Sequence, residues 1–157
     1  MHGRCRAPGG CCVLTSSMRV SDLIRKKGSS VVTLPPTATV ADLLETLDEH
    51  RIGAVVVVDE GGAVTGIASE RDVVHHLRGG SGTHSPVTEL MTAEVHTCTA
   101  GDDLVQLATV MTERRLRHLP VVEDGRLQGI VSIGDVVKAR LDALEAERDM
   151  LEDYLRR

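Results

Sequence analysis

Aromatic residues are almost absent from this 157-residue chain, which has no Trp, no Phe and a single tyrosine, Tyr154. Branched aliphatic and Ala side chains must therefore fill the core, and they suit short β-strands packed beneath Leu-bearing helices. A chain of this length forms one compact domain or two small ones joined closely. The missing aromatics also argue against a single-strand nucleic-acid binder that stacks bases on aromatic rings.

Positive charge is scarce as well. The formal net charge is −5, whereas a nucleic-acid-binding surface needs a basic face. No apolar run approaches the roughly 20 residues that a membrane-spanning helix requires, and the longest, Ala54–Val58, has the length of a buried strand. We therefore expect neither a nucleic acid nor a membrane as a partner.

Cysteines are few and unevenly placed. Cys5, Cys11 and Cys12 lie near the start and Cys98 in the body of the chain, so they outline no disulfide framework. A reducing, cytoplasmic compartment is the simplest interpretation. His96 and Cys98 are expected to share one face of a strand, but two ligands are too few for a stable zinc site, and no metal is predicted.

The chain contains an internal repeat. Residues 66–74, GIASERDVV, return as residues 129–137, GIVSIGDVV. Each copy follows a run of branched aliphatics and a Gly-bearing turn, at 54–61 and at 118–125. Supersecondary units repeated in order are typical of half-modules that bury their apolar faces against each other.

Hydrophobic periodicity predicts a β-α-β-β-α order in both halves, each behind a short leading helix. In the first half the leading helix is expected at 20–27 and the other elements at 31–33, 39–50, 54–58, 64–68 and 70–77. In the second half the leading helix is expected at 87–91 and the others at 95–97, 102–115, 118–122, 127–131 and from 133 onward.

These elements predict a division of the chain. Residues 18–78 form a first repeat, 79–86 a Gly-rich linker and 87–140 a second repeat. Residues 1–17 have no periodicity and no apolar segment of a secretory signal, so they are expected to be a disordered tail or to precede a natural start at Met18.

The final helix is expected to continue as an extension over 141–157. Its apolar stripe has alternating spacings of four and three, and only Arg148 interrupts it: Val137, Leu141, Leu144, Leu151 and Tyr154/Leu155. A stripe beyond the body of a domain needs a partner surface, so a homodimer is predicted.

The two copies resemble tandem CBS (cystathionine-β-synthase) domains, the pair often called a Bateman module. The likeness covers residues 18–140 and rests on the Gly-hydrophobic-x-Ser-x-x-Asp pattern of each copy and on the strand Leu119-Pro120-Val121-Val122. It implies an α/β (α+β) fold in which the repeats pack with pseudo-two-fold symmetry. It also implies a regulatory module that binds AMP, ADP, ATP, NAD(H) or another adenosine compound between the repeats. No catalytic motif is visible, so an enzyme is not expected.

The repeated Ser-x-x-Asp pattern places a carboxylate just inside a helix N-terminus. The helix dipole stabilises its ionised form there, and it can accept hydrogen bonds from two ribose hydroxyls. Asp72 and Asp135 occupy this position, and Ser69 and Ser132 lie three residues earlier, where each can cap the helix or reach a ligand. Capping alone also explains these residues, and that alternative stays open.

The resemblance implies two clefts, each made of one Asp and two residues of the opposite repeat. They are Asp135 with Val32 and Ile52, and Asp72 with His96 and Leu116. The implied phosphate-binding positions are Arg117 and His118 in the second copy, where the first copy has the uncharged pair 53–54. We therefore expect the Asp135 cleft to be the better site for an anionic nucleotide, and the Asp72 cleft to depend on Arg71.

Ligand binding is expected to change the angle between the halves and to signal to a separate, unidentified protein partner. Two alternatives remain open. One is a dimeric interaction scaffold whose clefts stay empty. The other is a redox-linked regulator that acts through Cys98 or the tail, since stand-alone CBS pairs in some lineages are linked to thioredoxin.

Overall fold

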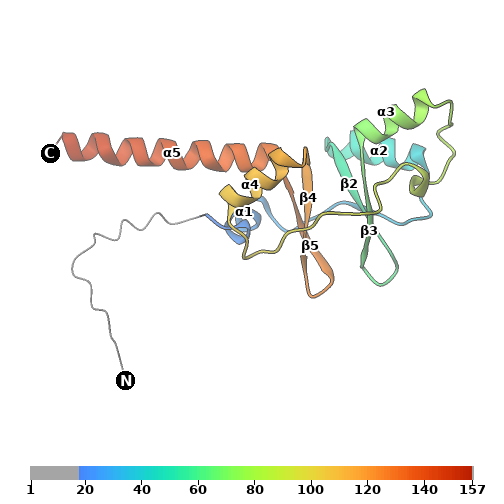
Figure 1. Ribbon diagram of the computed structural model, residues 1–157, viewed down its shortest axis with the longest axis horizontal. Coiled ribbons are helices and arrows are strands. Elements are labelled where there is room, and N and C mark those ends of the chain that lie inside the picture. Colours follow the sequence, from blue (N-terminus) through green and yellow to red (C-terminus); the bar gives the residue numbers. More distant parts are fainter. Residues whose placement is uncertain (1–17, 157) are drawn as a thin grey trace, which may run out of the picture.

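The structure is a computed structural model that describes residues 18–156, so the expectation for residues 1–17 lies outside the described part. Two small sheets stand side by side along the long axis of the molecule, and one long helix extends it at the C-terminal end (Figure 1). The first sheet has the order β1-β2-β3 and the second β4-β5.

The elements follow the predicted order. The helices are α1 (Val20–Lys27), α2 (Val40–His50), α3 (Glu70–Arg78), α4 (Leu104–Glu113) and α5 (Ile133–Leu155), with one 3-10 turn, η1 (Val87–Glu89). The strands are β1 (Thr33–Leu34), β2 (Ala54–Val58), β3 (Val64–Ser69), β4 (His118–Glu123) and β5 (Arg126–Ser132). The mixed α/β fold of two repeats and the extended C-terminal helix are confirmed.

Three helices begin with the same capping box. The hydroxyl oxygen of the N-cap residue accepts from the third helical N–H, and the Asp at that third position accepts from the N-cap N–H. The pairs are Thr39 with Asp42, Ser69 with Asp72, and Ser132 with Asp135. Each box fixes the start of its helix directly after a strand or an extended segment.

The two hairpins have matching registers, which brings both Ser-x-x-Asp motifs to equivalent places. Ala54 pairs with Ser69 in the first hairpin, and His118 pairs with Ser132 in the second. Both ladders are antiparallel and each shifts register once, between Val57 and Val58 or between 121 and 122. Each repeat therefore presents the start of its central strand beside the N-terminus of its last helix.

Each half has its own aliphatic core, and the leading element of each half packs into the core of the other. Val20 of α1 is fully buried with Leu104 and Val131 of the second half. Val87 of η1 is fully buried with Val40 and Val55 of the first half. The order of the repeats in the sequence does not reveal this exchange. The leading elements α1 and η1 bury the same apolar side chains whether each packs on its own half or on the opposite half.

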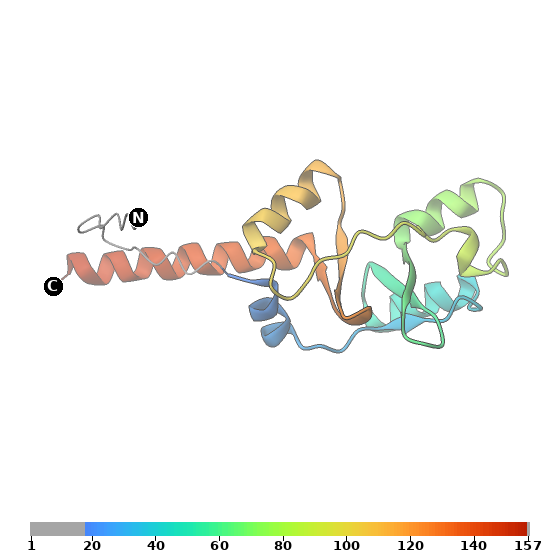
Figure 2. The same cartoon turned by 60° about the horizontal axis from the view of Figure 1, so that its bottom comes forward.

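The chain crosses between the two cores twice, at residues 28–32 and 93–97. Residues on either side of each crossing belong to different clusters: Leu23 and Cys98 to one, Leu34 and Met91 to the other. Both crossing segments are visible between the halves in Figure 2.

A glycine of each repeat makes room for the exchanged element. A Cβ on Gly66 would overlap the Sδ of Met91, which follows η1. A Cβ on Gly129 would lie 3.1 Å from the Cδ1 of Ile24 in α1. The repeated glycine of the sequence pattern is thus the place where the leading element of the opposite half lies against the hairpin.

Three short elements differ from the sequence prediction. The helix expected at 87–91 is the 3-10 turn Val87–Glu89. The strand expected at 95–97 is wrong: in the described residues it is replaced by a single parallel bridge between Cys98 and Val121. The N–H groups of Cys98 and Val122 donate to the carbonyls of Pro120 and Cys98, which closes one bridge and extends no further. The strand expected at 31–33 is shifted to Thr33–Leu34.

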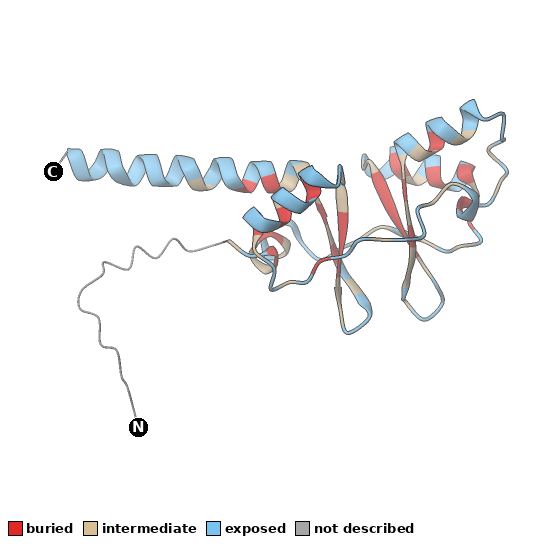
Figure 3. Ribbon diagram, in the orientation of Figure 1, coloured by how far each residue is buried: buried red, intermediate tan, exposed pale blue. Residues whose placement is uncertain are grey.

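Helix α5 leaves the body of the protein early. Val136 and Ala139 are buried, whereas almost all later residues are exposed and the helix projects away from both sheets (Figure 3). Within the described residues, no helix is long and apolar enough to cross a membrane.

Candidate functional site

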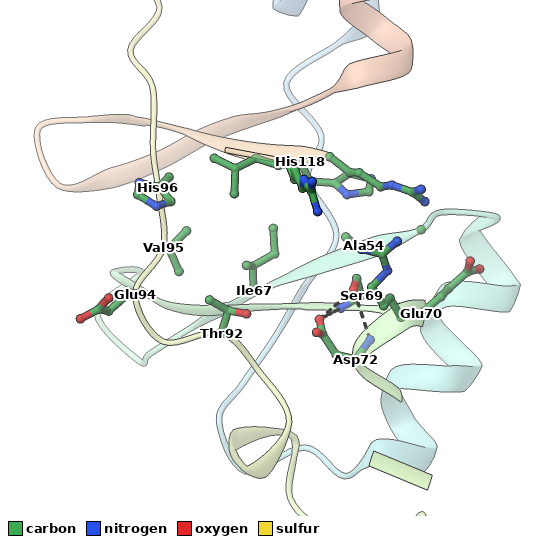
Figure 4. Close-up of a pocket in the computed structure, with 15 residues that line it drawn as sticks. Ala54, Ile67, Ser69, Glu70, Asp72, Thr92, Glu94, Val95, His96 and His118 are labelled. Carbon is green, nitrogen blue, oxygen red and sulfur yellow. Dashed lines mark hydrogen bonds between the residues drawn. The ribbon is translucent and has the colours of Figure 1, made fainter. Parts of the chain in front are cut away.

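A cavity of about 480 Å³ lies where the two repeats meet. It is bounded below by the end of β3 and the first turn of α3, and above by the start of β4, as Figure 4 shows. The structure brings together at this cavity five residues expected of the Asp72 cleft: Ser69, Arg71, Asp72, His96 and Leu116. Arg117 and His118 line it as well.

The Asp72 carboxylate is held in a fixed position at the cavity. Its Oδ2 accepts hydrogen bonds from the Ser69 N–H, at 2.8 Å, and from the Ser69 hydroxyl, at 2.7 Å. The N–H of Glu70, the first residue of α3, donates to the Gly53 carbonyl at 3.1 Å. All of the hydrogen bonds described for this carboxylate use Oδ2, and none is described for its Oδ1.

Cationic side chains reach the cavity from both repeats. Arg71 lies one residue before Asp72, Arg115 and Arg117 come from the segment that precedes β4, and His118 is the first residue of that strand. Burial, followed by the positive charge of Lys27, lowers the pKa of His118 below its ordinary value of 6.5. The imidazole is therefore mainly neutral near pH 7 and can take up a proton when an anion binds.

Sequence reasoning missed Arg115, and a signal for it exists in the repeat. Arg115 has a φ of 55° and Arg51, at the equivalent position of the first copy, has a φ of 52°. Both lie at the point where the chain leaves a helix in a left-handed conformation, which few non-glycine residues adopt. The repeated Arg–aliphatic pair at 51–52 and 115–116 marks this point in the sequence.

Asp135, the counterpart of Asp72, has a different environment. The ammonium of Lys27 lies 2.6 Å from Asp135 Oδ2 and also donates to the Ile130 carbonyl at 3.3 Å. The Ser132 N–H donates to the same carboxylate oxygen at 3.0 Å. Burial raises the pKa of Asp135, but the hydrogen bonds from Lys27 and Ser132 and the charge of Lys27 outweigh it, so the pKa lies below its ordinary value.

Arg117 and His118, expected in the Asp135 cleft, line the cavity that holds Asp72. His118 also lies near Asp135, whose negative charge opposes the lowering of its pKa. Val32 and Ile52, expected beside Asp135, do not line the Asp72 cavity, and their assignment stays a prediction. A Cβ on Gly53 would lie 3.6 Å from the His118 Cε1, so the segment before β2 and the start of β4 meet closely. Aligning the sequences of the two repeats does not show which of the two expected clefts Arg117 and His118 line.

The comparison with known families agrees with this geometry. The model of the CBS domain matches residues 20–79 and again residues 87–142. The chain belongs to the CBS domain family. A mitochondrial CBS domain-containing protein of Arabidopsis thaliana is 34% identical over 149 residues, which cover 88% of this chain and 72% of the relative.

Solved CBS structures share the fold. A CBS-domain containing protein from Agrobacterium tumefaciens is 46% identical, with a TM-score of 0.75, and the match covers 78% of this chain and 99% of that one. A CBS domain protein of Pyrobaculum aerophilum in complex with AMP is 26% identical, with a TM-score of 0.69, over 75% of this chain and 89% of that one. A CBS domain pair in complex with 5′-methylthioadenosine and S-adenosyl-L-methionine is 25% identical, with a TM-score of 0.71, over 82% and 98% of the two chains.

Two further reactive groups of this CBS pair are Cys98, which is shielded, and His96, which lines the cavity. Cys98 is only 4% exposed, and burial, followed by the charge of Asp102, raises the pKa of its thiol to about 12. Nδ1 of His96 lies 3.4 Å from an Arg114 nitrogen. Across residues 18–156, no three His, Cys, Asp or Glu side chains are grouped as metal ligands.

Proposed function

We propose that this CBS pair is a regulatory module that binds an adenosine-containing ligand in the cavity between its repeats. The observation that carries the proposal is that one cavity holds the Asp72 carboxylate, the N-terminus of α3 and cations from the opposite repeat. The P. aerophilum relative in complex with AMP and the CBS pair in complex with 5′-methylthioadenosine and S-adenosyl-L-methionine support this class of ligand.

Each part of such a ligand has a matching chemical group. Asp72 accepts hydrogen bonds from the ribose hydroxyls through its carboxylate, as a charge-assisted acceptor. The aliphatic side chains of Ile67, Val95 and Leu116 offer an apolar contact for the base. Arg117 and His118, together with the positive end of the α3 dipole, favour a phosphate. A cavity of about 480 Å³ is in the range of ordinary small-molecule sites.

We propose a balance between the two clefts that is the reverse of the sequence expectation. Lys27 neutralises Asp135 at 2.6 Å, and a ribose must displace this ammonium before it can use the carboxylate. Asp72 has no such competitor among its described contacts. We therefore assign the stronger site to Asp72 and a weaker one to Asp135.

The output of the module is a change in the angle between its halves, which a separate protein partner recognises. The exposed stripe on α5 supports a homodimer as the working unit. A cytoplasmic location remains the prediction from cysteine usage, although the A. thaliana relative is a mitochondrial protein.

The test is a calorimetric titration of nucleotide-stripped full-length protein with AMP, ATP, NADH and S-adenosylmethionine. Asp72→Asn removes the charge while keeping the size, and loss of a charged hydrogen bond of about 1.5–3 kcal/mol weakens binding at least about tenfold. Asp135→Asn is expected to weaken binding much less.

Asp42→Asn is the matched control, because Asp42 forms the same capping box in α2 and does not line the cavity. Thermal unfolding of each variant shows whether a loss of binding comes from a change at the site or from unfolding of the protein. No saturable heat with any of the four compounds would overturn the proposal and leave the dimeric scaffold. Loss of binding in Asp135→Asn alone would restore the original ranking of the clefts.

A further inference from the structure

The apolar stripe of α5 faces solvent along the free part of the helix. Four of its members are about half exposed, at 51% for Val137, 55% for Leu141, 44% for Leu144 and 59% for Leu151. The opposite side of the same turns carries Ala139, which is buried against the body. The stripe and the body-facing side are therefore distinct surfaces, and the stripe is accessible from the first turns of α5 onward.

The stripe has the spacing of a coiled-coil seam. Val137, Leu141, Leu144, Arg148 and Leu151 follow one another at alternating steps of four and three residues, which keeps them on one side of a helix. Arg148 occupies one seam position and forms intrahelical ion pairs with Asp149 and Glu152. A seam with one charged member specifies how two helices align, because few alignments leave that charge in a favourable place.

The charges that flank the seam change sign along the helix. Lys138 and Arg140 lie beside its first half, whereas Glu145, Glu147 and Glu152 lie beside its second half. A helix with cations at one end of its seam and anions at the other is complementary to a second copy that runs in the opposite direction. Charges at these flanking positions set the orientation of coiled-coil partners.

We infer that α5 pairs in antiparallel orientation with α5 of a second copy, with Leu141 against Leu144 of the partner subunit. In this register Lys138 lies beside Glu145 of the partner subunit and Arg140 beside Glu147 of the partner subunit. The two-fold symmetry doubles each contact, so all four flanking pairs join opposite charges. This inference rests on the homodimer of the proposed function and adds its geometry.

The competing alignments place like charges together. In a parallel pair, Glu147 lies beside Glu152 of the partner subunit, and Arg148 meets its own copy within the seam. An antiparallel pair displaced by one heptad sets Glu145 and Glu147 against their own copies. In the inferred register, Arg148 instead lies opposite Val137 of the partner subunit, where its long side chain can extend to solvent.

The test uses charge reversal in the full-length chain, with the dimer dissociation constant measured by sedimentation over a concentration series. Glu147→Arg and Arg140→Glu each convert two attractive pairs into repulsive ones, so each is expected to weaken the dimer about tenfold. The double variant exchanges the two charges and is expected to restore the dimer. In a parallel dimer, Glu147→Arg would instead tighten association by facing Glu152 of the partner subunit.

Asp153→Arg is the matched control, since it makes the same change of charge on the side of α5 away from the seam, and it is expected to leave the constant unchanged. Cysteine cross-linking gives a second measurement, in a background with Cys5, Cys11 and Cys12 changed to Ser. A mixture of Leu141→Cys and Leu144→Cys proteins is expected to form a disulfide-linked dimer, and Leu144→Cys alone is not.

Three results would overturn the inference, and they differ in what else they overturn. Rapid cross-linking of Leu144→Cys alone would show a parallel pair. A dimer that no α5 variant weakens would use another surface. Both of these results would leave the proposal of a homodimer intact. A protein that stays monomeric at all concentrations would contradict the homodimer as well as its geometry.

Discussion

The ammonium of Lys27 lies 2.6 Å from the carboxylate of Asp135, so a residue of the first repeat neutralises the Ser-x-x-Asp carboxylate of the second. This pair exists because α1 packs onto the second core, where Lys27 also reaches the Ile130 carbonyl. No equivalent cation is described at Asp72 within residues 18–156. The exchange of leading elements thereby makes the two Ser-x-x-Asp motifs chemically unequal.

Lys27→Met is expected to raise the pKa of Asp135 and to destabilise the protein by about 1 kcal/mol at pH 7, as suits a partly exposed pair. The folded pKa of Asp135 lies below its ordinary value of 3.8. The stability that it contributes is therefore complete above that value and is lost as the pH falls through the folded pKa. Urea unfolding between pH 2.5 and pH 7 measures both effects.

Lys26→Met serves as the control for this prediction, because Lys26 is an exposed neighbour in the same helix. If Lys27→Met lowers the free energy of unfolding as much at pH 2.5 as at pH 7, the loss of stability is not electrostatic.

His118 is expected to titrate below 6.5 in the free protein, because burial and the charge of Lys27 both disfavour its protonated form. The unfolded chain binds more protons in the interval between the two pKa values. The contribution of His118 to stability is thus complete above 6.5 and falls as the pH drops through the folded value. Nuclear magnetic resonance titration of the imidazole signals measures the pKa directly.

Binding of AMP is expected to raise the pKa of His118 and to cause proton uptake, since a phosphate stabilises the imidazolium. Calorimetry in buffers of different ionisation enthalpy measures this uptake, and His118→Gln should lack the part due to the imidazole. A midpoint at or above 6.5 without ligand would contradict the buried environment.

Gly66→Ala is expected to destabilise the protein by about 1–3 kcal/mol, because the added methyl overlaps Met91 in a packed contact. In a Met91→Ala background the same substitution should cost much less, and urea unfolding of the four proteins gives the coupling energy. Gly82→Ala is the control, since a Cβ there meets nothing within 4 Å. Equal costs in both backgrounds would mean that Met91 is not the obstacle.

Cys98 is expected to react with thiol reagents at least about a thousandfold more slowly in the native protein than after unfolding. A pKa of about 12 against an ordinary 9.0 leaves little thiolate at pH 8, and the thiolate is the reactive form. Iodoacetamide labelling followed by mass spectrometry, with Cys5, Cys11 and Cys12 changed to Ser, measures the rate. Rapid native labelling would favour the redox-linked regulator instead.

The sequence predicts the longer elements well because their signals are local. The apolar spacing of Val40, Leu43 and Leu47 and the cap at Thr39 place α2 within one residue of its observed start. The stripe on α5 likewise predicts a helix that continues to Leu155. These patterns depend on the residues of the element itself, so no knowledge of distant contacts is needed.

The sequence-based predictions fail where a contact between residues far apart in the chain determines the local structure. The segment 95–97 has the composition of a strand, but its neighbour β4 offers it only the single bridge at Cys98. Five residues of the Asp72 cavity are predicted from the repeat, whereas the presence of Arg117 and His118 at the same cavity depends on how the start of β4 meets the first repeat. The ion pair of Lys27 depends on which core receives α1, and the order of the repeats does not encode that choice.

The two crossings of the chain, at 28–32 and 93–97, restrict how this protein can move. Two rigid bodies that are joined at two separated points rotate easily only about the line through those points. Val95 and His96 belong to one of these crossings and also line the cavity. A ligand bound in this cavity as proposed would therefore contact the crossing segment itself, and its shape would determine the angle between the two halves.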